Sequence, residues 1–382
     1  MGRKDKLSPL LLAVLLGLSG CASMLERDSI VVTAHPEHPI TDDSSVLLAE
    51  NYQDLVNDVL YFVRQGTEVG SIRLTNYPQG RDVGADLSNA CLEVARDAPL
   101  GAYAVEVIEH DYTRVVQDYE ATIRITYRRS LEQMQGMKNV IGSSAIRRVL
   151  QEQLSRFSPE AVLQVAYFTE DENYIASLIR QAYYDTPAAA LGMPQYTITL
   201  YPDAGRERIV EIQLTYPEPA DTLRSKRQQL IQRVEVLRSS FHGLTGQDAA
   251  LAICGLLRQC VQGNPGQEEG ASAYHVLLEG QGDSEGMALA FRLLCQSEGL
   301  DAWVVQGVRD GSVHFWNVFA LGDGQYRHVD ASSGDALLLT DSELEALGYS
   351  WDRDAVFPCV SPEGDAPPET VMAQVKISEN NT

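Results

Sequence analysis

The sequence predicts an α+β protein in which two tandem small α/β units precede a domain built from a helix packed on an antiparallel sheet. Residues 46–217 contain a similar succession of helical and β-type segments twice, and residues 225–360 lead from helical segments into three short β-type runs. The chain has 382 residues, of which 44% are hydrophobic, so it is long and apolar enough to bury more than one core.

The first twenty residues have the features of a bacterial lipoprotein signal peptide. Basic residues precede the apolar run LLLAVLLGL, which is short for a membrane span and leads into LSGC, ending at Cys21. Small residues directly before a cysteine resemble the bacterial lipobox, so we expect residues 1–20 to be removed and Cys21 to be lipidated. Several acyl chains on one cysteine anchor a protein stably. The alternative is an ordinary secretory signal with an unrelated cysteine.

The charge balance narrows the classes of partner. The formal net charge is −23, and removal of residues 1–20 takes away three positive charges and one negative charge, leaving −25. Such a surface repels nucleic acid and anionic lipid head groups. We therefore expect an extracytoplasmic protein, lipid-anchored to the bacterial cell membrane through Cys21, that binds a peptide, a protein or a cell-wall ligand and no nucleic acid.

The repeated segments follow a spacer over residues 21–45, which is rich in Pro, Asp and Ser and is expected to be flexible. Unit 1 is expected over residues 46–130 and unit 2 over residues 131–220, each with a helix, a strand, a second helix and a strand closing a hairpin. The closing strands EATIRITYR and IVEIQLTYP match best. Neither unit has a phosphate-binding loop, a metal-ligand spacing or a nucleophile elbow, which favours a binding or spacing role.

Five cysteines remain after Cys21, and their odd number argues against a complete disulfide framework. Cys254 and Cys260 are six residues apart on a predicted helix, which places them on different faces. Cys295 lies about three helical turns beyond Ser284. We expect these three cysteines to pack as small apolar residues.

Three residues in the last domain, expected over residues 221–360, have the order and the secondary structure of a nucleophile, a base and an orienting acid. Ser284 begins the predicted helix in GDSEGMALAF, and His314 and Asp330 follow on predicted strands. A helix N-terminus favours a developing anion because its N–H groups are free and its dipole is positive there. No cofactor is expected. A zinc site made of His314, His328 and Asp330 is not expected.

Several segments in the same order resemble the transglutaminase-like domain of bacterial cell-surface proteins, a relative of the papain-type cysteine proteases. They are GDSEGMALAFRLL, GLDAWVVQG, HFWN, YRHVD and LLLTDSELEALGYSWDRDAVFPC, and the resemblance covers residues 225–360, a little over a third of the chain. It implies a papain-like arrangement of helix and antiparallel sheet. It also implies that His314 and Asp330 occupy the catalytic His and Asp positions, while Ser284 stands in place of the catalytic cysteine.

This substitution leaves two interpretations of Ser284, and in a third alternative the repeated units bind the partner while the last domain is only a scaffold. The favoured one is a pseudoenzyme whose cleft binds a ligand, because a hydroxyl is not ionised beforehand as a thiol is. The alternative is a serine hydrolase or acyltransferase that uses Ser284, His314 and Asp330. Asp283 and Ser284 are also both favoured helix caps, so Ser284 is expected to cap its helix. His328 is expected beside the cleft, Trp316 in the core, and residues 361–382 as a disordered tail.

Overall fold

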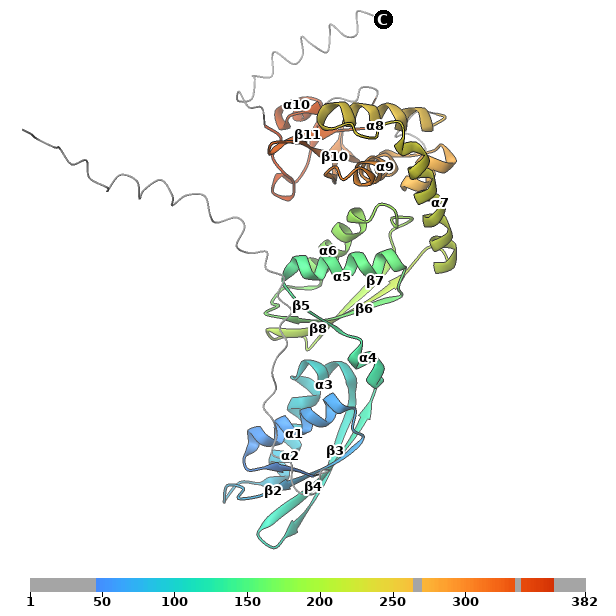
Figure 1. The fold of residues 1–382 in the computed structure, drawn as a ribbon. Helices are drawn as coiled ribbons and strands as arrows, with labels where there is room; N and C mark the ends of the chain where they lie inside the picture. The colour runs from blue at the N-terminus through green and yellow to red at the C-terminus, as the bar shows by residue number, and fades with distance from the viewer. Residues whose placement is uncertain (1–45, 264–269, 334–337, 361–382) are drawn as a thin grey trace, which may run out of the picture. The chain divides into compact units, whose positions relative to one another are not determined.

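The computed structural model describes residues 46–263, 270–333 and 338–360 (Figure 1). The predicted signal peptide, Cys21, the spacer and the predicted tail all lie outside the described residues. Contacts divide the chain into two compact units. The first runs to Ile146 and includes Leu163–Thr169 and Tyr201–Ile209, and the second contains Arg147–Val162, Glu170–Leu200 and the chain from Val210 onward. None of the helices in the described ranges combines the length and hydropathy needed to span a bilayer.

The first sheet has four strands in the order β1-β2-β4-β3. β1 runs parallel to β2, and β4 pairs antiparallel with both β2 and β3. Apolar residues from the strands and from the helices α1 and α2 form one buried cluster. The elements are β1 (Val46–Ala49), α1 (Tyr52–Gln65), β2 (Val69–Leu74), α2 (Val83–Arg96), α3 (Pro99–Ala104), β3 (Val105–Val115) and β4 (Asp118–Tyr127).

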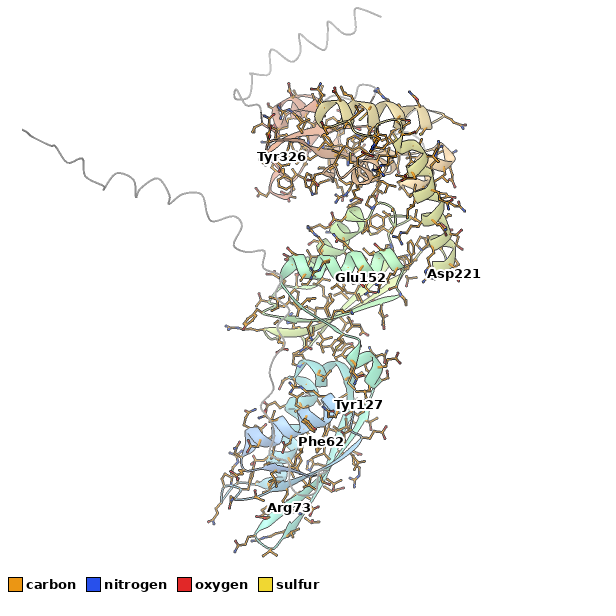
Figure 2. All side chains as sticks on the ribbon, in the orientation of Figure 1. Phe62, Arg73, Tyr127, Glu152, Asp221 and Tyr326 are labelled. Carbon is orange, nitrogen blue, oxygen red and sulfur yellow. The ribbon has the colours of Figure 1, made fainter. Side chains whose placement is uncertain are left out.

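Capping residues fix both ends of helix α1, and one long-range contact holds its C-terminal end. The Asn51 side chain accepts a hydrogen bond from a first-turn N–H group, and Gly66 takes the left-handed conformation at φ 67° that ends the helix. Tyr127, at the end of β4, donates its hydroxyl to the carbonyl oxygens of Phe62 at 3.1 Å and Thr67 at 3.0 Å (Figure 2). The closing strand therefore holds the C-terminal end of α1.

The second sheet has the order β5-β6-β8-β7, which corresponds to the order of the first. β5 runs parallel to β6, as β1 does to β2. Both β1 and β5 are four-residue strands that the sequence patterns did not predict, because a run that short has no clear period. The elements are α4 (Leu131–Gln135), β5 (Lys138–Ile141), α5 (Gly142–Arg156), β6 (Glu160–Ala166), α6 (Glu172–Asp185), β7 (Gln195–Tyr201) and β8 (Glu207–Thr215).

The third sheet has the order β12-β11-β10-β9-β13, and all of its neighbours are antiparallel. Helix α9 packs on one face, where Asn317 donates its side-chain amide to the Ala288 carbonyl at 3.0 Å and Phe291 meets Phe319 edge to face. An apolar cluster around Trp316 covers the other face. The three predicted β-type runs are β9, β10 and β11. The strands are β9 (Ala302–Arg309), β10 (Ser312–Gly322), β11 (Gln325–Val329), β12 (Leu338–Leu339) and β13 (Tyr349–Ser350). The helices of this part of the chain are α7 (Ala220–Arg238), α8 (Gly246–Cys260), α9 (Ser284–Ser297) and α10 (Asp341–Ala346), with the π-helical turn η1 (His275–Glu279) and the 3-10 turn η2 (Arg353–Ala355).

One buried carboxyl group makes the stability of the first unit depend on pH. Burial raises the pKa of Asp58 in α1 to about 8, and the nearby Asp54 carboxylate adds to the shift. The folded state therefore binds a proton that the unfolded chain releases near pH 4, and stability falls as the pH rises between these values.

Asp58→Asn is expected to remove this dependence, since the amide has the shape of the acid and no charge. Hydrogen exchange of the α1 amides will be slower in the variant than in the wild type at pH 8, and nearly equal in the two at pH 3, which is below the pKa of this carboxyl group in the unfolded chain. Asp97→Asn, at an exposed site of the same unit, is the control and should change neither comparison. Equal exchange of wild type and Asp58→Asn at pH 8 would contradict the shift.

Candidate active site

Ser284 is the first residue of α9 and does not cap it. The cap is Asp283, whose carboxylate accepts a hydrogen bond from the Gly286 N–H at 2.8 Å. The prediction that Ser284 caps the helix is therefore wrong, because the backbone of Asp283 is extended and that of Ser284 is already helical. Ser284 is buried, and its Oγ accepts a hydrogen bond from the Phe315 N–H at 3.3 Å, which joins α9 to β10.

Gly286 allows the preceding segment to pack directly on the start of α9. A Cβ atom at this position would lie 2.1 Å from the Gly270 carbonyl oxygen and 3.1 Å from backbone atoms of Ser272. No side chain fits there without moving the backbone. The glycine in GDSEG is thus required by a close backbone approach beside Ser284.

His314 and Asp330 form the hydrogen bond that the sequence pattern predicts. His314 lies near the start of β10 and Asp330 directly follows β11, and the His314 Nε2 is 2.7 Å from the Asp330 Oδ2. Because Nε2 is engaged, Nδ1 is the ring nitrogen left for a reacting group. Within the described residues, no hydrogen bond joins this ring to Ser284, whose hydroxyl lies against the backbone of the next residue, Phe315.

The Asp330 carboxylate is enclosed by donors. Its Oδ1 accepts hydrogen bonds from the Ser332 N–H at 2.9 Å and the Ser332 hydroxyl at 2.6 Å, and its Oδ2 accepts one from the Tyr349 hydroxyl at 2.6 Å. The guanidinium of Arg309 lies 3.5 Å from Oδ2. Burial acts to raise the pKa of Asp330, but the hydrogen bonds from His314, Ser332 and Tyr349 hold it below its usual value. The carboxylate is therefore ionised at neutral pH.

Tyr349 is the member of this group that the sequence patterns did not reveal. Its ring lies edge to face with His314 at 5.6 Å and with Trp316 at 5.3 Å, and the Arg309 guanidinium sits 4.9 Å from its centroid. Arg309 was missed as well, because both residues reach Asp330 only through strand pairing. Ser332 had a local signal, since serine two residues after an aspartate commonly forms such a turn.

His328 does not line a cleft, so that expectation is wrong. It is fully buried behind Trp316, whose Nε1 donates to the His328 Nδ1 at 3.0 Å, while the His328 Nε2 is 2.9 Å from the Asp341 carboxylate. Burial lowers the pKa of His328, which keeps the ring neutral with its proton on Nε2. Trp316 is fully buried, as expected.

His328, Asp341 and Cys359 place one candidate metal ligand each within 4.8 Å of one another. Their hydrogen bonds do not fit such a site. Coordination through the His328 Nε2 would displace its proton while the Trp316 N–H still occupies Nδ1, leaving the ring without any proton. Asp341 also accepts a hydrogen bond from the Cys359 N–H at 3.2 Å. The group is explained as a hydrogen-bonded core.

Glu285 is a half-buried carboxyl group beside Ser284. Burial raises the pKa of Glu285 to about 7, and the nearby Asp283 carboxylate contributes to this rise. The Tyr184 hydroxyl donates a hydrogen bond to the Glu285 Oε1 at 3.1 Å, which acts to lower this pKa. The Tyr184 ring also lies 5.9 Å from Phe315. Tyr184, on helix α6, thus contacts both Glu285 and Phe315, the two residues next to the Ser284 hydroxyl. The sequence patterns did not indicate this contact.

The cysteines in the described part of the chain are unpaired. Burial raises the pKa of the Cys254 thiol to about 12 and that of Cys295 well above its ordinary value. Such thiols are not nucleophilic at neutral pH. The expectation that Cys254 and Cys295 pack as apolar residues is confirmed by their complete burial, and Cys260 is partly buried.

Tyr349→Phe removes one of the donors to a buried carboxylate. A hydrogen bond to a charged group is worth about 1.5–3 kcal/mol, and we expect a loss of that size in the free energy of unfolding at pH 7. The pKa of Asp330 is lower in the folded state than in the unfolded chain. The stabilisation is therefore complete when the pH is above the pKa of the unfolded state, and it is lost as the pH falls through the pKa of the folded state.

The difference between wild type and Tyr349→Phe, measured by urea unfolding, should therefore shrink below about pH 4. Tyr326→Phe is the matched control, since the Tyr326 ring stacks on Phe357 and its hydroxyl bonds to no described residue. A difference that stays constant down to the lowest pH at which both proteins are folded would show that the hydroxyl does not act through the Asp330 charge.

Comparison with known proteins identifies the domain that holds these residues. The sequence model of the transglutaminase-like superfamily matches residues 239–331. A solved structure titled "Crystal structure of a TGase" matches with 13% identity over 61% of this chain and 67% of that one, at a TM-score of 0.26. No curated protein matches the chain. Residues 239–331, which include Ser284, His314 and Asp330, therefore form a transglutaminase-like domain.

Proposed function

We propose that this protein is a lipid-anchored, extracytoplasmic binding protein whose transglutaminase-like domain is a pseudoenzyme. The bond between the Ser284 Oγ and the Phe315 N–H carries this proposal. Among the described residues the hydroxyl has no hydrogen bond to His314, and it occupies a buried position that links α9 to β10. The serine thus has a structural role that needs no chemistry.

The chemistry of the hydroxyl supports the same conclusion. A helix N-terminus and a nearby imidazole lower the pKa of a cysteine thiol by several units, whereas a serine must lose its proton during attack. That loss requires a base in hydrogen-bond contact with the hydroxyl. His314 is hydrogen-bonded to Asp330, which leaves the His314 Nδ1 free. No nucleophile among the described residues forms a hydrogen bond with that nitrogen.

The ligand proposed for the cleft is a peptide, a protein or a cell-wall component. The ring nitrogen of His314 and the half-buried Phe315 and Tyr184 offer polar and aromatic contacts beside Ser284. We also propose that residues 46–130 and 131–220 are two copies of one unit that precede the domain over residues 221–360, in which helix and sheet have a papain-like arrangement. The corresponding orders of the first two sheets support the duplication.

A fluorophosphonate probe tests the inactive site. We expect no labelling of wild type, because Ser284 has no base in contact. Ser284→Cys should gain a thiol that iodoacetamide alkylates at pH 6 faster than a free cysteine, since α9 and His314 lower its pKa. Cys254 and Cys295 provide internal controls that should not react in the folded protein.

Two further variants make the result decisive. Adding His314→Ala to Ser284→Cys should slow alkylation if the thiol is activated by the imidazole. Labelling of the wild type by the fluorophosphonate that disappears in Ser284→Ala would overturn the pseudoenzyme and establish the alternative, a serine hydrolase or acyltransferase.

The membrane anchor is tested separately. Cells that express the full chain in the presence of labelled palmitate should incorporate label into the wild type and none into Cys21→Ser, because the thiol of Cys21 is the proposed attachment point. The wild type should also sediment with membranes. Sedimentation of Cys21→Ser with membranes to the same extent would contradict lipid anchoring.

A further inference from the structure

Strand β9 has an outer edge that is only partly paired. β10 pairs with it from Ala302 to Arg309, but β13 pairs only with Val308 and Arg309. In the part of the chain that the structure describes, no strand covers the outer edge between Ala302 and Gly307. An open edge presents hydrogen-bonding groups in a row, which another strand can use.

The register identifies which groups face outward. The Ala320 N–H donates to the Asp301 carbonyl at 3.0 Å, so the odd-numbered residues of β9 direct their backbone groups toward β10. Val304 and Gln306 therefore direct their N–H and C=O groups to the open edge. Gln306 is exposed and Val304 is half-buried, and β13, the described strand on that side, pairs no further than Val308.

The open edge lies between two walls. Gln306 stands opposite Phe315 in the ladder and shares its face, which is the face contacted by Tyr184 of α6. Trp303 points to the other face, where its ring lies 4.7 Å from Phe357. The two walls and residues 303–306 line an open cavity of about 620 Å³, which is within the size range of binding pockets.

The walls differ in charge. Arg147, Arg180 and Arg292 line the cavity on the α6 side, where Asp185 pairs with Arg147 at 3.3 Å and Arg292 at 2.7 Å. Arg180 is exposed and forms no ion pair with a described residue, so this wall has a net positive charge in a strongly acidic protein. The opposite wall is largely apolar, with Trp303, Val356 and Phe357, and has Asp352 and Asp354 at its rim.

We propose that the outer edge of β9 binds an extended peptide strand in which acidic and apolar residues alternate. The strand would form backbone hydrogen bonds with Val304 and Gln306. Its side chains would point alternately to the cationic α6 wall and to the wall of Trp303 and Phe357, because successive side chains of a strand lie on opposite faces. This inference rests on the proposed binding role, and it locates a peptide site in a cavity that neither Ser284 nor His314 lines.

The probes are fluorescein-labelled, end-blocked octapeptides in which valine alternates with glutamate, threonine or lysine. We expect the wild type to bind the glutamate peptide most tightly and the lysine peptide least, measured by fluorescence anisotropy. Arg180→Gln should weaken binding of the glutamate peptide and leave the threonine peptide nearly unchanged, because the lost contact is electrostatic.

Gln306→Pro and Gln306→Ala form a matched pair. Proline removes the outward N–H group and spares the ladder to β10, whereas alanine keeps that group. We expect affinity for the glutamate peptide to fall about tenfold in Gln306→Pro, the value of one hydrogen bond, and to be unchanged in Gln306→Ala. Hydrogen exchange of β10 amides checks that the proline variant remains folded, and in the wild type the Val304 and Gln306 amides should become protected when peptide binds.

Three results would overturn the site: none of the peptides binds, the two Gln306 variants bind equally well, or the Val304 and Gln306 amides gain no protection. Loss of binding in His314→Ala with full binding in Gln306→Pro would place the peptide in the Ser284 cleft, which refutes the edge site but supports the proposed function. Dimerisation of wild type that Gln306→Pro abolishes, without peptide binding, would assign the edge to a second copy of the chain.

Discussion

The buried carboxylate of Asp330 organises the candidate site. It joins the ring of His314 on β10, the hydroxyl of Tyr349 on β13 and the turn at Ser332, and these donors outweigh the effect of burial on its pKa. A buried charge is tolerated only when its oxygens are satisfied, so the ends of three strand segments are held together by one group. The His314 ring is thereby held with its Nε2 hydrogen-bonded to Asp330 and its Nδ1 free to contact another group.

Ser284 is held at the start of α9 by three features of its surroundings. The residue is held by the Phe315 N–H, the helix start is capped by Asp283, and Gly286 lets the preceding segment pack against it. Because the cap belongs to Asp283, helix capping does not explain why a serine is present. The buried hydrogen bond from the Phe315 N–H gives the Ser284 hydroxyl a structural partner on β10.

Helix α6 connects the second α/β segment with the transglutaminase-like domain. Its Tyr184 contacts Glu285 and Phe315, and its Asp185 holds the buried Arg292 of α9. The same helix forms one wall of the cavity at the edge of β9. If that edge binds peptide, the preceding segment contributes to recognition as well as to spacing, a role compatible with the absence of catalytic motifs in it.

Sequence alone determined the order of helices α7, α8 and α9 and of strands β9, β10 and β11, the pairing of His314 with Asp330, and the burial of Trp316 and Cys295. These predictions follow from local hydrophobic periodicity and from the order of short sequence segments, both of which can be read directly from the sequence. Tertiary structure alone decided that Tyr349 and Arg309 reach Asp330, that His328 is buried behind Trp316, and that β9 keeps an open edge. These features depend on which strands pair and in which register, and no local pattern encodes contacts between residues that are distant in the chain.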